Sequence, residues 1–192
     1  MEKVDPRVLR TRELLLDAFM SGMREKGFDE VSIQDITDRA TLNRATFYAH
    51  FPDKYALLDT SMRELFGQML QHRLSMPGTT PHAHLRQLLL AVTDHLEELR
   101  ARHCKDSYQR FAVLAEAQIK SQLQDAVCTW LDDHPQTRSQ PRHRLELAAT
   151  LVSWSMYGAA LAWQDAPNAQ SAESFADEVV PLLVATITAV SD

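Results

Sequence analysis

The residues best suited to chemistry lie between Asp38 and Asp53, in a stretch of chain that contains no Asp or Glu. Within it, Arg44 can reach a guanine edge or a phosphate, and Tyr48 and His50 can donate to phosphate oxygens. A carboxylate on a helix in the major groove would be repelled by the phosphates that line both walls. The stretch therefore favours DNA binding, although the whole chain has a net charge of -6.

Two short helices are expected to position these side chains. Ser32 precedes an apolar stripe and Asp35 follows three residues later, which resembles a capping box and predicts a helix over 33–40. Asn43 is a good N-cap for a second helix over 44–50, which ends before Pro52. Two short helices joined by a tight turn indicate a helix-turn-helix.

The rest of the chain favours long helices over strands. Only five Gly and eight Pro interrupt it, and 45% apolar with 24% charged residues is ordinary for a globular protein. The apolar spacing predicts an all-α protein of about nine helices. Besides the two above, they cover residues 7–26, 54–74, 82–103, 107–119, 120–133, 142–164 and 172–190.

Cofactors, metals and membranes have little support in the sequence. Cys104 and Cys128 form no CxxC pair, and the pairs His82/His84 and His103/Cys104 lack further ligands at a zinc spacing. We expect no cofactor and no metal, and the sequence does not decide whether either cysteine has a redox role. No apolar run is long enough to span a bilayer, so we expect a cytoplasmic protein without membrane contact.

The run VSIQDITDRA from Val31, followed by NRATFYAHFPDK from Asn43 and by Leu57-Leu58, resembles the signature of the TetR family of bacterial transcriptional regulators. The resemblance implies an amino-terminal three-helix DNA-binding domain, here 1–53. It also implies a larger helical domain, here 54–192, that dimerises and binds a small effector. It further implies a repressor that binds a palindromic operator as a dimer and leaves it when the effector binds.

Matched position by position, the recognition helix of the family falls on residues 43–50, its phosphate-contacting tyrosine on Tyr48, and a helix-4 lysine on Lys54. One departure is Thr41, where the family often has Gly in the turn. The full set predicted to contact DNA is Ser32, Asn43, Arg44, Ala45, Thr46, Tyr48, His50 and Lys54.

The sequence does not name the effector, the operator or the genes. The last two helices combine small and large apolar residues, and by the resemblance they form the homodimer interface, the alternative being an intramolecular core. An effector pocket is expected to be mostly apolar. Its candidate lining residues, for each of which ordinary core packing is the alternative, are Phe66, Met69, Phe111, Trp130, Trp154, Met156 and Tyr157.

Two other classes of protein remain. An enzyme is disfavoured, because the chain has no nucleophile motif, no phosphate-binding Gly loop and no paired carboxylates in a suitable setting. A helical binding protein of the same fold that has lost DNA affinity is the stronger alternative. Such a protein would act as a ligand or partner module.

Overall fold

The structure is a computed structural model of the chain, and it consists of helices. It describes residues 5–75, 80–102, 105–135, 137, 139–166 and 170–191; the side chains of 101–115, 190 and 191 are not among those described. Eight helices and no strand occur in this part of the chain, which confirms the all-α prediction. The helices are α1 (Pro6–Lys26), α2 (Ile33–Ala40), α3 (Arg44–His50), α4 (Lys54–Leu74), α5 (Pro81–Arg102), α6 (Lys105–Asp133), α7 (Arg142–Asp165) and α8 (Ala172–Ser191).

One predicted helix boundary is wrong. The apolar spacing predicts a break between residues 119 and 120, but α6 continues through it as one helix of 29 residues. The reason is visible in the sequence, because no Gly or Pro interrupts residues 105–133. The count in the described residues is therefore eight helices and not nine.

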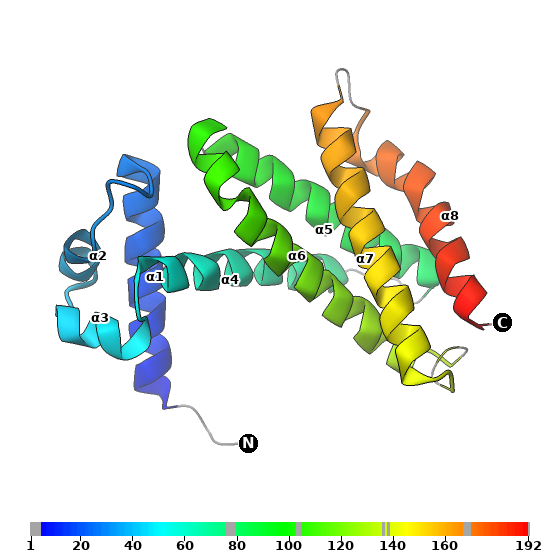
Figure 1. The fold of residues 1–192 in the computed structure, drawn as a ribbon, viewed down its shortest axis with the longest axis horizontal. Helices are drawn as coiled ribbons and strands as arrows, with labels where there is room; N and C mark the ends of the chain where they lie inside the picture. The colour runs from blue at the N-terminus through cyan, green and yellow to red at the C-terminus, as the bar shows by residue number, and fades with distance from the viewer. Residues whose placement is uncertain are drawn as a thin grey trace.

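The helices form two groups that α4 connects (Figure 1). Helices α1, α2 and α3 lie at one end of the molecule, and α5 to α8 pack together at the other. Helix α4 begins beside the first group and runs beneath the second. Its apolar residues divide accordingly, since Leu57 and Leu58 belong to the amino-terminal core while Phe66 and Leu70 belong to the second core.

The amino-terminal core is small and aromatic. Phe19 from α1, Phe47 from α3 and Leu57 from α4 have no exposed surface. Phe28 packs its ring edge against Phe19, with ring centroids 6.1 Å apart. Four elements thus meet on one cluster, which fixes α3 relative to α1 and α4.

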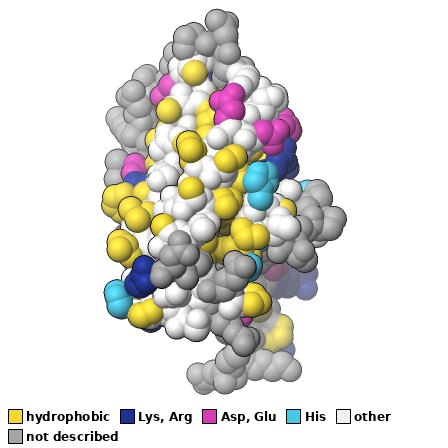
Figure 2. Space-filling model, turned by 90° about the vertical axis from the view of Figure 1, so that its right-hand side faces the viewer, with side chains coloured by type: hydrophobic (Ala, Val, Ile, Leu, Met, Phe, Trp, Pro, Cys, Tyr) yellow, Lys and Arg dark blue, Asp and Glu magenta, His cyan; other side chains and the backbone are white. Residues whose placement is uncertain are grey.

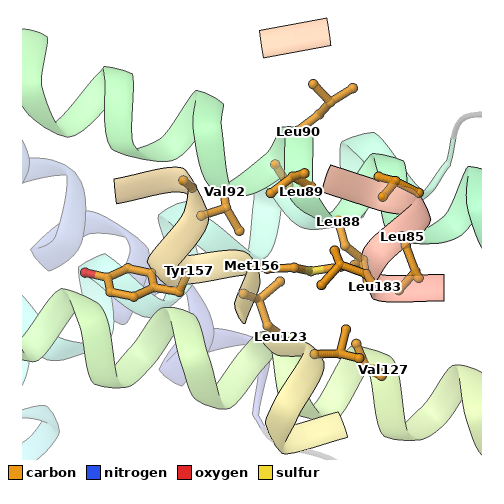
Figure 3. Packing of buried hydrophobic residues seen from close by; sticks show 14 of the residues in the cluster. Leu85, Leu88, Leu89, Leu90, Val92, Leu123, Val127, Met156, Tyr157 and Leu183 are labelled. Carbon is orange, nitrogen blue, oxygen red and sulfur yellow. The ribbon is translucent and has the colours of Figure 1, made fainter. Parts of the chain in front are cut away.

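The second core is larger and mostly aliphatic (Figure 3). Met156 of α7 reaches among Leu88 of α5, Leu123 of α6 and Leu183 of α8, and all four are nearly fully buried. Helix α7 contacts α5, α6 and α8. It is the one described helix long and apolar enough to cross a membrane, but 44% of its apolar window is buried in the protein. Its apolar character is thus partly accounted for by core packing.

Candidate nucleic-acid interface

Helix α2 begins with the predicted capping box. The Ser32 hydroxyl accepts a hydrogen bond from the Asp35 amide at 3.1 Å, and the Asp35 carboxylate accepts one from the Ser32 amide at 2.9 Å. Two backbone N–H groups at the helix start are thereby satisfied. This places Ser32, an exposed residue, at the amino terminus of the first helix of the pair.

Two ion pairs attach α2 to α1. The two terminal guanidinium nitrogens of Arg39 donate to the two carboxylate oxygens of Glu25, at 2.7 and 2.5 Å, and the Lys26 ammonium lies 2.8 Å from an Asp35 carboxylate oxygen. The Arg39 hydrogen bonds lower the pKa of Glu25, and those from Lys26 and Ser32 lower the pKa of Asp35 far below its usual range. Arg39, which the sequence places in the acid-free stretch, therefore has a partner within the protein.

The turn after α2 contains a strained residue. Thr41 has φ 57° and ψ 43°, the left-handed helical region that β-branched residues rarely adopt. Its amide donates to the Asp38 carbonyl at 3.2 Å, and the Leu42 amide donates to the Thr37 carbonyl at 2.9 Å. These bonds close the end of α2 and stabilise a backbone conformation that would suit Gly better.

Asn43 starts α3 as the sequence predicts. Its side-chain oxygen accepts hydrogen bonds from the Thr46 amide at 2.7 Å and from the Thr46 hydroxyl at 3.0 Å. Phe47 on the inner face is fully buried and lies 6.0 Å from the Phe51 ring, measured between centroids. The cap and the buried ring together fix the rotation of α3, so that the opposite face points to solvent.

The outward face of α3 is free of acid. Arg44, Ala45 and Tyr48 are exposed, and Tyr48 retains 49% of its surface accessible although its ring packs edge-on against Phe47. His50 is half-buried at the end of the helix. Within the described part of the chain, the guanidinium of Arg44 has no ion-pair partner, so it is available to an external anion.

Lys54 lies differently from the other predicted contacts. Its ammonium donates to the carbonyls of Phe28 at 2.7 Å and Val31 at 2.9 Å, and lies 3.5 Å from the Asp29 carbonyl. It also lies 4.3 Å from the centre of the Phe28 ring. No local pattern in the sequence indicates this contact, because the acceptors are 23 to 26 residues earlier in the chain.

The structure does not gather the predicted effector residues in one cavity. Phe66, Met156 and Tyr157 are buried in the core, and Met69 is half-buried. Trp154 is 56% exposed, with the ammonium of Lys120 lying 4.2 Å from its ring centre. The side chain of Phe111 lies outside the described residues.

Trp130 does line a groove, which has a volume of about 480 Å³ between α4, the start of α5 and the end of α6. The Trp130 ring stacks on the His84 ring with centroids 5.1 Å apart, and the centroid of the His134 ring lies 4.9 Å from that of Trp130. Burial lowers the pKa of His84 to about 4, so this imidazole is neutral at pH 7. Asp125 and Asp133 are the charged residues that line the groove.

Metal and thiol chemistry gain no new candidates from the structure. No group of three or more His, Cys, Asp or Glu that could hold a metal ion occurs among the described residues. Burial raises the pKa of the Cys128 thiol, which keeps it protonated and weakly nucleophilic at pH 7. Cys104 and His103 lie outside the described residues.

The similarity of this chain to known proteins differs between the two groups of helices. Residues 15–60 match the family model described as "Bacterial regulatory proteins, tetR family". The HTH-type transcriptional regulator YxbF of Bacillus subtilis is 38% identical over 72 residues, which are 37% of this chain and 19% of that protein. The HTH-type transcriptional regulator BetI of Yersinia pestis is 33% identical over 92 residues, 46% of each chain. The chain thus spans about half the length of BetI and about a fifth of YxbF in these matches.

Solved structures extend the likeness to the whole fold. The regulator RolR, solved with its ligand resorcinol, superposes with a TM-score of 0.61 at 21% identity and covers 97% of this chain and 95% of its own. At that identity the likeness concerns the fold alone. The sequence match, in contrast, falls on the residues that build the helix-turn-helix. Residues 15–60 of this chain are thus similar to the TetR family of bacterial regulatory proteins.

Proposed function

We propose that this protein is a ligand-responsive transcriptional repressor that binds a palindromic DNA operator as a homodimer and is released by a small-molecule effector. The observation that carries the proposal is the outward face of α3, where exposed Arg44 and Tyr48 stand on a rigidly capped, acid-free helix. A short helix of this kind fits the major groove. The carboxylates nearest to it on α2, Asp35 and Asp38, are engaged by hydrogen bonds within the protein.

In this proposal seven of the eight residues predicted to contact DNA divide into two roles. Arg44, Ala45, Tyr48 and His50 approach bases and phosphates directly. Ser32, Asn43 and Thr46 lie at the amino termini of α2 and α3, where backbone N–H groups favour phosphate. Lys54, the eighth, donates to backbone carbonyls within the protein.

The surface of α7 and α8 supports the proposed dimer. Leu147, Leu151 and Trp154 recur at helical spacing on α7 and are 59%, 50% and 56% exposed, and Leu182 of α8 is 70% exposed. Figure 2 shows hydrophobic side chains spread along the side of the molecule on which α8 lies. Large apolar side chains exposed together indicate a protein contact. A twofold dimer would present two α3 helices about 34 Å apart, one helical turn of DNA.

The dimer can be tested without any ligand. Light scattering after size-exclusion chromatography should give twice the chain mass of 21.8 kDa, and Leu151→Glu should give the single chain mass because it places a charge in the interface. Glu146→Gln, an exposed change on the same helix, serves as the control. A wild-type protein that stays monomeric at all concentrations would exclude this part of the proposal.

We propose that the effector binds in the helical domain, in the groove beside Trp130. It has the volume of a small-molecule site, and it joins α4, which reaches the DNA-binding helices, to α5 and α6. An effector that prefers a conformation with mis-spaced α3 helices would lower operator affinity by its differential affinity for the two states. Saturating ligands that bind but never change operator affinity would exclude this coupling.

The decisive experiment is selection of bound duplexes from a random-sequence library by the purified protein at physiological salt. Recovery of an inverted repeat supports a dimeric, sequence-specific regulator. Recovery of no enriched sequence, with the protein folded and dimeric, supports the alternative of a helical binding module without DNA affinity.

A further inference from the structure

The contact between Lys54 and the segment joining α1 to α2 is more specific than a surface lysine requires. An ammonium has three N–H donors, and three backbone carbonyls converge on this one, those of Phe28, Asp29 and Val31. The Phe28 ring lies beside the charge as well. The lysine is half-buried, which keeps the contact partly shielded from water.

The segment that Lys54 holds decides where the helix-turn-helix lies. It leaves α1 at Gly27, whose φ of 79° lies in the region that favours glycine, and enters α2 at the Ser32 cap. Val31 is buried and packs close to Gly22 of α1, where an added Cβ would lie 3.1 Å from a Val31 methyl. Few other conformations of this segment would keep both the Lys54 hydrogen bonds and the packing of Val31 against Gly22. The position of the segment therefore sets the placement of α2.

Lys54 is also the first residue of α4, and α4 is tied to α6 of the helical domain a short distance further along. The Gln118 side-chain amide donates to the Asp59 carboxylate at 2.6 Å, and the Gln122 side-chain amide donates to the Arg63 backbone carbonyl at 3.1 Å. Within ten residues of α4 the chain therefore contacts both the segment before α2 and the helical domain. A movement of α6 that displaces the start of α4 would pull on that segment through Lys54.

We propose that Lys54 is a positioning residue, whose ammonium fixes the α1–α2 segment to the start of α4 and so sets the orientation of the helix-turn-helix relative to the helical domain. Its effect on DNA binding is indirect, through α2 and α3. This role differs from the direct DNA contact that the sequence predicts for Lys54, because its N–H donors are directed at carbonyl oxygens of the protein. The DNA arm of the test below rests on the proposed function, whereas the first arm does not.

The first arm measures amide hydrogen exchange in the free protein. Lys54→Met removes charge-assisted hydrogen bonds, so the Val31 amide and its neighbours in 28–32 should exchange roughly 10-fold faster or more. Arg63→Met, at an exposed arginine of the same helix, removes the same charge and should leave this exchange unchanged. Unchanged exchange in the lysine variant would overturn the proposal. If Lys54→Met does not fold, Lys54→Gln, which keeps a shorter donor, is judged by the same criterion.

The second arm uses the duplex recovered from the library and measures affinity over a series of salt concentrations. For a positioning residue, Lys54→Met weakens binding while the slope of log K against log salt stays unchanged, and Lys54→Arg does not restore affinity because a planar guanidinium does not fit among converging carbonyls. A slope smaller by about one, together with full rescue by arginine, would mean a phosphate contact and would overturn the proposal. Should no duplex bind, the proposed function fails while the exchange experiment still decides the role of Lys54.

Discussion

The two cores of this protein differ in how their helices are held. Around the amino-terminal core, α2 and α3 are short, and side-chain caps from Ser32 and Asn43 fix their starts. In the helical domain, α7 begins at Arg142, directly after Pro141 and without a side-chain cap, and extends for 24 residues through a large aliphatic core. Short helices cannot be stable by themselves, so the first region needs specific local contacts, whereas burial alone can hold the long helices of the second.

The difference also explains why the family likeness is uneven. A function built on α3 depends on particular residue types at fixed places, and the family match falls on residues 15–60. The helical domain needs only apolar residues of suitable volume, and many sequences satisfy that requirement. Its fold is therefore shared with RolR at 21% identity.

The largest expected effect tests whether the two cores are stable independently. Phe47→Ala removes a fully buried ring from the small core and should cost about 3–5 kcal/mol. All three tryptophans, at positions 130, 154 and 163, lie in the helical domain. In urea, far-ultraviolet circular dichroism should therefore show early loss of helix while the tryptophan fluorescence midpoint stays near that of the wild type.

Met156→Ala is the matched change in the large core, with an expected cost of about 2–5 kcal/mol that moves the fluorescence midpoint. If both variants shift both signals equally, α4 couples the two cores into one cooperative unit and the comparison fails.

The next effect concerns the exposed face of α3. Arg44→Ala should weaken binding of the selected duplex by about 1–3 kcal/mol, because it removes a cation that is free to contact a base or phosphate. Arg24→Ala, at an exposed arginine of α1, is the control and should change affinity much less. Fluorescence anisotropy with labelled duplex at fixed salt measures both. Equal losses would point to net charge and not to α3.

A smaller effect is expected at the turn between α2 and α3. Thr41→Gly should raise the free energy of unfolding by about 1 kcal/mol, since it relieves a β-branched residue at φ 57°. Gly27→Ala should act in the opposite direction, because Gly27 has φ 79° and an added Cβ would meet no atom within 4 Å, leaving only backbone strain. Thermal denaturation compares the two. A destabilised Thr41→Gly protein would show that the threonine side chain contributes contacts that outweigh the strain.

A further expected effect is a pH dependence of stability that belongs to the helical domain. Burial lowers the pKa of His84 from 6.5 to about 4, so the unfolded chain takes up a proton more readily than the folded one. The folded state with a neutral His84 therefore has its full free energy of unfolding above pH 6.5, and part of that free energy is lost as the pH falls toward 4. The melting temperature should decrease less between pH 7.5 and 5 in His84→Gln than in the wild type, and His143→Gln, at an exposed site, should behave as the wild type. An unchanged pH profile in His84→Gln would contradict this assignment.

Local signals in the sequence were enough for much of the DNA-binding unit. The capping box at Ser32 and the Asn43 cap can both be predicted from the sequence, because each depends on residues three positions apart. The continuity of α6 was misread, since weak helical periodicity does not by itself mark an end.

Other features needed the tertiary structure. The partners of Arg39 and Lys54 are distant in sequence, so only the tertiary structure shows that these cations contact Glu25 and backbone carbonyls within the protein. Likewise, the apolar residues Trp130, Trp154 and Met156 look alike in the sequence, but one lines a groove, one is exposed and one is buried. The sequence by itself determined the helices and the acid-free face of α3, because hydrogen bonding and periodicity act over a few residues. Only the tertiary structure decided which charges are neutralised and which apolar side chains reach the surface, because these depend on how distant helices pack.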